Sequence, residues 1–225
     1  MLVIGARGAT GYVLGRGAGS AAANWWEAGG ATNCVAAHQP KGAASLAASY
    51  VNLANPGTYD AAPGVAPTWD AAGGWTFNGT SQYLTTGVVP ASGWSMIVRY
   101  TDASTATADR YIIGSFSTNA RFAIQYQTFG SSRRYSYGSA TVEKAATATS
   151  GVIALVAANG YFNGLLDATG SGAFTGTGQV IFIASWNING VPSTYFSGKI
   201  LALAIYSATL SAAQVAAVTA AMAAL

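Results

Sequence analysis

The chain has 225 residues, enough for one large all-β domain or two small ones with a hydrophobic core. Charged residues make up only 8% of it, against roughly 25% in an average soluble protein, and the net charge is +3. Lys and Arg are scattered singly apart from Arg133–Arg134, so we expect no nucleic-acid partner. Apolar runs such as Val152–Ala158 fall far short of the roughly 18–20 residues of a spanning helix, so we expect no membrane span.

Residues 1–31 are rich in Gly and Ala, and we interpret them as an N-terminal arm. Within this arm, residues 2–11 (LVIGARGATG) have the pattern of a dinucleotide-binding loop, which requires a strand, a glycine turn and then a helix. Gly15, Gly17 and Gly19 would break that helix, at up to roughly 1 kcal/mol each relative to alanine. Alternating strand–helix units do not follow, so we expect no cofactor.

From Asn33 onward, segments rich in Val, Ile, Tyr, Phe and Thr recur between turn signals. Many short strands with almost no helix between them indicate an antiparallel all-β sandwich or barrel. Asn-Gly pairs close tight hairpins, and we predict that strand 152–158 turns at Asn159–Gly160 into Tyr161–Phe162. The other predicted strands lie near Tyr50–Val51, Trp75–Phe77, Tyr83–Thr85, Trp94–Tyr100, Tyr111–Ser115, Phe122–Gln127, Arg134–Gly138, Val180–Ile183 and Lys199–Tyr206.

The tail carries the signature of a helix. Ser211 and Gln214 form a capping box at its start. Four apolar residues then recur at three- and four-residue steps, which places them on one helical face: Val215, Val218, Met222 and Leu225. The sequence thus predicts three parts, namely the arm (1–31), a sandwich (32–210) and an alanine-rich C-terminal helix (211–225).

Several short motifs occur in a fixed order: Trp75–Gly79, Gln82–Leu84, Trp94–Tyr100, Tyr161–Gly164, Ile181–Ser185, Tyr195–Ile200, Ala204–Tyr206 and Leu210–Val215. In this order they resemble the laminin-G-like, concanavalin-A-like jelly-roll superfamily. The resemblance implies two stacked, curved antiparallel sheets. It implies no activity, because this fold hosts lectins, adhesion modules, glucanases and virion proteins. Leu201 and Ala202 stand where the family often has an acid, which weakens any calcium site.

No catalytic set is evident. Cys34, the single cysteine, lies four residues from His38, the single histidine, and we interpret it as a core residue. With one of each, a zinc site is not expected. Tyr195 and Lys199 have a dehydrogenase-like spacing, but on a strand they would lie about 13 Å apart. Four acids fall in polar turn contexts and are interpreted as solvated loop residues: Asp102, Asp109, Glu143 and Asp167.

The first function hypothesis is therefore a non-enzymatic structural protein. Low surface charge and uncharged ends favour self-association. This hypothesis favours a bacteriophage virion component, such as a head decoration or tail protein, located in the virion. Its partners would be copies of itself or other virion proteins. The predicted assembly contacts are Trp25, Trp26, Val215, Val218, Met222 and Leu225.

The alternative is a lectin-like module that binds a glycan outside the cell. Sugar recognition uses aromatic platforms beside amide and charged hydrogen-bonding groups. The segments at residues 121–126 and 186–189, which we expect to lie near each other, together offer both kinds of side chain. The candidate glycan-binding residues are Arg121, Gln125, Tyr126, Trp186, Asn187 and Asn189.

Overall fold

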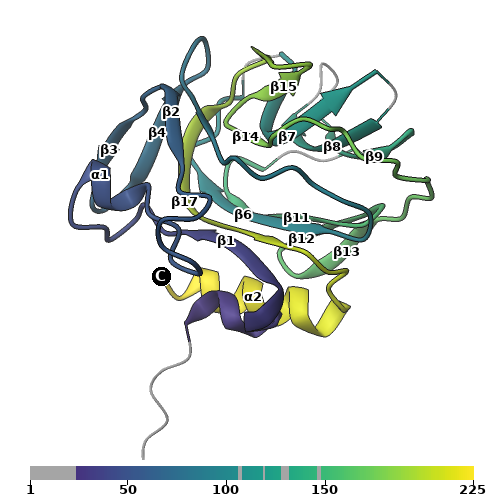
Figure 1. The fold of residues 1–225 in the computed structure, drawn as a ribbon, viewed down its shortest axis with the longest axis horizontal. Coiled ribbons are helices and arrows are strands. Elements are labelled where there is room, and N and C mark those ends of the chain that lie inside the picture. Colours follow the sequence, from purple (N-terminus) through teal and green to yellow (C-terminus); the bar gives the residue numbers. More distant parts are fainter. Residues whose placement is uncertain (1–23, 106–107, 119, 128–131, 146–147) are drawn as a thin grey trace, which may run out of the picture.

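A computed structural model describes residues 24–105, 108–118, 120–127, 132–145 and 148–225. Two stacked sheets form a sandwich, with a helix at the C-terminus, as the sequence predicts (Figure 1). The glycine motif at residues 2–11 lies outside the described residues, as does the arm up to residue 23.

The first sheet contains eight strands within the described residues, in the order β13-β12-β11-β6-β17-β4-β3, with β1 on the second half of β17. Every pairing in it is antiparallel. The strands are β1 (Cys34–His38), β3 (Thr68–Asp70), β4 (Gly74–Asn78), β6 (Ser95–Thr101), β11 (Gly151–Val156), β12 (Asn159–Phe162), β13 (Leu165–Ala168) and β17 (Ser197–Tyr206).

The second sheet has nine strands in the same described ranges, in the order β10-β9-β8-β7-β14-β5-β2, with the hairpin β15–β16 beside β7. Its pairings are antiparallel except for β15, which runs parallel to β7. The strands are β2 (Ala62–Val65), β5 (Tyr83–Thr85), β7 (Arg110–Ser117), β8 (Ala120–Gln127), β9 (Arg133–Gly138), β10 (Ala140–Lys144), β14 (Phe182–Ile183), β15 (Trp186–Ile188) and β16 (Val191–Ser193).

The main core lies between the sheets and is rich in aromatic rings. Strand β8 shows how the sequence builds it, since Phe122, Ile124 and Tyr126 point into this core while the alternate residues point away. Tyr126 also packs edge-on against Phe196 at 5.1 Å between ring centroids.

Two local sequence predictions were wrong. Tyr50–Val51 is no strand, because it follows the short helix α1 (Leu46–Ser49) in a turn. The hairpin turns at Ala157–Ala158 instead of Asn159–Gly160, since Val156 already pairs with Asn159. Gly160 is needed inside β12, because a Cβ there would lie 2.3 Å from the Tyr135 ring.

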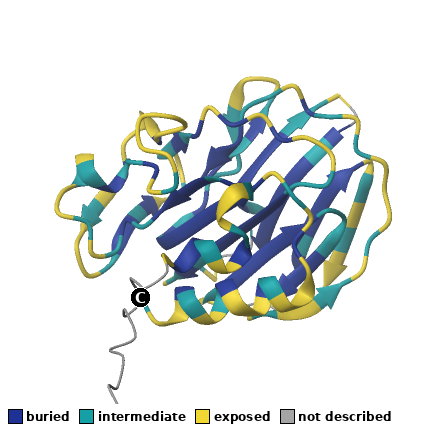
Figure 2. Ribbon diagram, turned by 60° about the horizontal axis from the view of Figure 1, so that its bottom comes forward, coloured by how far each residue is buried: buried dark blue, intermediate teal, exposed yellow. Residues whose placement is uncertain are grey.

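A second hydrophobic layer covers the outer face of the eight-stranded sheet. It is built by the C-terminal helix α2 (Ala212–Ala223) and the 3-10 helix η1 (Trp25–Gly29), as Figure 2 shows from below. Gln214 of α2 donates a hydrogen bond to the carbonyl of Gly29 at 3.2 Å. The Arg99 guanidinium, which lies on the adjacent sheet, donates to the carbonyl of Met222 near the end of the helix.

This layer corrects the predicted assembly contacts. Trp25 and Trp26 lie on η1, at 8% and 9% exposure, and pack against the chain's own α2. Val215, Val218 and Met222 are fully buried in the same layer, and Leu225 packs at its edge. These side chains are covered by their own chain because η1 and α2 pack together on one sheet. They therefore have little surface left to offer a neighbour, and the end of the predicted arm belongs to the fold.

The cap of α2 gives a direct test of this layer. The Ser211 hydroxyl oxygen accepts a hydrogen bond from the Gln214 backbone N–H at 3.2 Å, and the Ser211 backbone N–H donates one to the Gln214 side-chain oxygen at 2.8 Å. We expect Ser211→Ala to lower the free energy of unfolding by about 1 kcal/mol, while Ser211→Asp, which keeps an acceptor, stays near the wild type. Urea denaturation followed by tryptophan fluorescence measures both, and equal effects of the two variants would contradict the capping role.

Candidate functional site

The outer face of the nine-stranded sheet carries a row of polar residues in strand register. Glu143 on β10 lies opposite Arg134 on β9, Arg134 lies opposite Gln125 on β8, and Gln125 lies opposite Tyr111 on β7. Directly opposed residues share one face of a sheet. Since the alternate residues of β8 fill the core, this row faces away from it.

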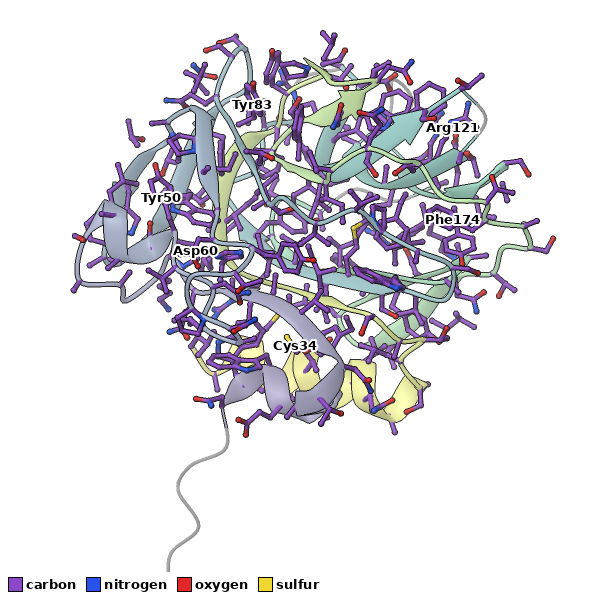
Figure 3. All side chains as sticks on the ribbon, viewed as in Figure 1. Cys34, Tyr50, Asp60, Tyr83, Arg121 and Phe174 are labelled. Carbon is purple, nitrogen blue, oxygen red and sulfur yellow. The ribbon has the colours of Figure 1, made fainter. Side chains whose placement is uncertain are left out.

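A groove of about 450 Å³ opens along this row. That volume lies within the roughly 300–1,000 Å³ typical of small-molecule sites. Figure 3 shows Arg121 on this side of the sandwich and Cys34 on the opposite side, near α2. Two arginines and two acids line the groove: Asp109, Arg121, Arg134 and Glu143.

Aromatic rings form one wall of the groove. Tyr111 and Trp186 stack with centroids 4.4 Å apart and planes 9° apart, and Phe116 meets Trp186 at 5.0 Å. The parallel pairing of β15 with β7 brings these rings together from segments some 70 residues apart. Burial raises the pKa of the Tyr111 hydroxyl, which therefore stays protonated at neutral pH.

The floor of the groove is an ion-paired arginine. Arg134 contacts the Glu143 carboxylate at 2.6 Å and donates a hydrogen bond to the Gln125 side-chain oxygen at 3.2 Å. Burial lowers the pKa of Arg134, but its ion pair with Glu143 raises it by more, so the arginine pKa lies above its ordinary value. Arg134 is therefore a fixed, charge-balanced group.

Three residues that line the groove each have a buried polar atom with no hydrogen-bond partner within the described chain: Asp109 Oδ1, Trp186 Nε1 and Thr194 Oγ1. Thr194 is brought there because its carbonyl accepts a hydrogen bond from the Tyr111 backbone N–H at 3.1 Å. Buried polar atoms are nearly always paired, so each such atom calls for an explanation.

The structure brings together only part of the predicted glycan-binding set. Arg121 and Trp186 line the groove, and Gln125 lies buried beneath it against Arg134. Asn189 is exposed at the tip of the β15–β16 turn and does not line the groove.

The other two were wrong. Tyr126 points into the core, because it alternates with Gln125 along β8. Asn187 is buried, and its side chain fixes the hairpin by bonding to Val180 and to the Gly190 N–H.

Sequence reasoning missed several groove residues, above all Asp109, Tyr111, Arg134 and Thr194. Strand alternation could have indicated two of them, Tyr111 and Arg134, which lie directly opposite Gln125 on the neighbouring strands. If Gln125 faces outward, both must face outward too, but the register of these strands cannot be predicted from the sequence alone.

Two of the four acids interpreted as solvated loop residues lie on strands in ion pairs. Asp167 on β13 pairs with Arg133 at 3.0 Å, and Glu143 on β10 pairs with Arg134. Asp102 fits the prediction, because it is exposed and contacts Lys199 at 2.7 Å.

The remaining candidate motifs do not assemble into a catalytic site. Burial raises the pKa of the Cys34 thiol to about 12, and Cys34 packs in the layer beneath α2 while His38 lies beside Trp75. Lys199 pairs with Asp102, whereas the Tyr195 hydroxyl donates to the carbonyl of Pro192. Among the residues described, no helix is long and apolar enough to cross a bilayer.

No protein-family model and no curated protein matches the chain. A mutant of Trypanosoma rangeli sialidase that displays trans-sialidase activity matches its fold with a TM-score of 0.60 and 13% identity, over 86% of this chain and 33% of the sialidase. The likeness is one of fold. The same sialidase in complex with sialic acid gives a TM-score of 0.59 and 14% identity over the same shares. The chain thus spans about a third of the sialidase.

A looser match is the CBM40 module of the Ruminococcus gnavus IT-sialidase, bound to α2,3-sialyllactose. Its TM-score is 0.45 at 17% identity, over 58% of this chain and 84% of that module. A match at this level supports no argument about the site.

Proposed function

We propose that this chain is a non-catalytic glycan-binding module whose site is the groove on the nine-stranded sheet. The observation that carries the proposal is that three residues lining the groove, Asp109, Trp186 and Thr194, each have a polar atom without a hydrogen-bond partner in the described chain. A module of this kind works outside the cell, in contact with surface or matrix carbohydrate.

The unpaired atoms call for a ligand that both donates and accepts hydrogen bonds. The Asp109 carboxylate oxygen accepts only, while the Trp186 indole N–H donates only. A sugar hydroxyl does either, and a pyranose presents several hydroxyls on a rigid ring. The stacked pair of Tyr111 and Trp186 adds a rigid apolar surface beside them.

The groove acids are arranged for binding rather than for glycoside hydrolysis. Asp109 lies at the start of β7 and Glu143 on β10, three strand spacings away, which is about 14 Å in the sheet. Paired catalytic carboxylates stand about 5 to 9.5 Å apart. Glu143 also contacts Arg134 at 2.6 Å.

The glycan-binding hypothesis fits these observations better than a virion component. The virion hypothesis drew on termini free to clasp neighbours, and Trp25, Trp26 and the apolar face of α2 are instead covered by their own chain. The sialidase of similar fold was captured with sialic acid, which agrees with a carbohydrate ligand without carrying the proposal.

The test is binding to an array of neutral and acidic oligosaccharides, followed by calorimetry on those retained. We expect Asp109→Asn and Trp186→Phe each to weaken binding about tenfold, since the first replaces a charged acceptor with a weaker neutral one and the second removes the indole donor. Recovered oligosaccharides are expected to be intact by mass spectrometry.

Matched control variants lie elsewhere in the molecule. Asp102→Asn changes an exposed acid that contacts Lys199, and Trp69→Phe removes an indole that donates to Pro40. Both should leave affinity within about twofold of the wild type. Retention of no oligosaccharide, or equal loss in the control and groove variants, would reject the proposal.

A further inference from the structure

We infer that the glycan bound in this groove carries an anionic substituent, a carboxylate or a sulfate, and that Arg121 binds it. This inference rests on the proposed function and specifies the class of sugar. The charged side chains that line the groove are not distributed evenly along its length.

One of the two groove arginines is already neutralised. Arg134 contacts Glu143 at 2.6 Å, so its charge is balanced before any ligand arrives. Arg121 forms no ion pair with any residue that the structure describes. It is half-buried, and a desolvated guanidinium without a counter-charge favours an anionic partner.

Arg121 is also held in position. Its guanidinium carbon lies 5.3 Å from the centroid of the Phe116 ring, its directly opposed neighbour on β7. Phe116 in turn packs against Trp186 at 5.0 Å. An arginine fixed on an aromatic face loses little side-chain freedom when it binds a planar anion.

Asp109, the groove acid without an ion pair in the described chain, lies at the opposite end of the same strands. Asp109 comes just before β7, near Tyr111, which pairs with Gln125. Arg121 lies four residues from Gln125 along β8, a distance of about 13 Å at the rise of a strand. The groove is thus polarised, with an acceptor at one end for hydroxyl groups and an unpaired cation at the other.

The test compares ligands that differ only in charge. Calorimetry at low salt would measure trigalacturonic acid and 3′-sialyllactose, each against its carboxyl methyl ester. A sulfated disaccharide and its unsulfated form distinguish sulfate from carboxylate as the anion. We expect at least one anionic form to bind about tenfold more tightly than its neutral counterpart, with the difference shrinking as salt rises.

Variants assign the preference to one residue. Arg121→Gln should abolish the difference between charged and neutral ligands, while Arg121→Lys should retain part of it. Lys199→Gln removes one positive charge from a partly buried, ion-paired site on β17 outside the groove and should change nothing.

The outcomes separate this inference from the proposed function. The inference is overturned if charged and neutral forms bind equally, or if the preference for the charged form survives Arg121→Gln. In either case, binding that still depends on Asp109 and Trp186 leaves the proposed function in place. If no sugar binds, either in these pairs or on the array, both are rejected.

Discussion

Replacing Asp167 with alanine is expected to destabilise the protein by about 3–5 kcal/mol, because it breaks a buried ion pair and leaves its partner unpaired. Arg133 donates two hydrogen bonds to the Asp167 carboxylate, each at 3.0 Å. The two side chains are only 5% and 9% exposed. The Tyr135 hydroxyl donates a third bond to Asp167 at 2.8 Å, so the carboxylate is fully engaged.

The position of this pair makes the loss severe. Arg133 belongs to β9 of the nine-stranded sheet, whereas Asp167 belongs to β13 of the other, so the pair joins the two sheets at one edge. The Arg133 guanidinium also lies 3.9 Å from the centroid of the Phe162 ring. Without Asp167, a desolvated cation would remain against this ring and the Tyr135 hydroxyl.

The neighbouring ion pair on the same strand is the matched control. Arg134 and Glu143 are 29% and 42% exposed, so Glu143→Ala should cost less than about 1 kcal/mol. Urea denaturation of both variants measures the contrast. Removing both charges with Arg133→Met and Asp167→Leu should recover much of the loss. A cost for Asp167→Ala no larger than that for Glu143→Ala would contradict the structural role given to this pair.

The fold was largely predictable because its strands follow local rules. Alternation along β8 separates core residues such as Ile124 from outward ones such as Gln125, and the Ser211–Gln214 capping box marks the start of α2. The strands missed in the sequence are mostly short or exposed. Every residue of β2 (Ala62–Val65) is exposed, so no apolar pattern marks it.

The groove could not be predicted in the same way, because it depends on contacts between distant segments. Trp186 reaches Tyr111 only through the parallel pairing of β15 with β7, which no local pattern encodes. The same reason explains the error at the termini. Trp26 and Val218 look like exposed contacts when each segment is read alone, and they prove to lie buried in one hydrophobic layer.

A last expected result concerns acid stability, and it depends on His38. This side chain is fully buried in β1, with its ring 6.0 Å from that of Trp75. Burial lowers the pKa of His38 to about 4, against weaker opposing effects of the Val51 and Tyr50 backbone and of Asp60. In the unfolded chain the pKa returns to its ordinary value of about 6.5.

The sign of the pH dependence follows from these two values. Between pH 6.5 and 4 the unfolded chain binds a proton that the folded chain does not, so lowering the pH favours unfolding. The stability present above pH 6.5 should fall by about 3 kcal/mol as the pH reaches 4, since each pKa unit is worth about 1.4 kcal/mol. Below pH 4 His38 contributes no further loss.

Because the chain contains a single histidine, its protonation is directly observable. The imidazole C–H proton resonance of the folded protein should stay at its neutral position down to about pH 5. Urea denaturation from pH 7 to 4 should give a smaller slope for His38→Leu than for the wild type, the remainder arising from carboxylates. A titration midpoint near 6.5 in the folded protein, or identical slopes for the two proteins, would show that His38 is not the group responsible.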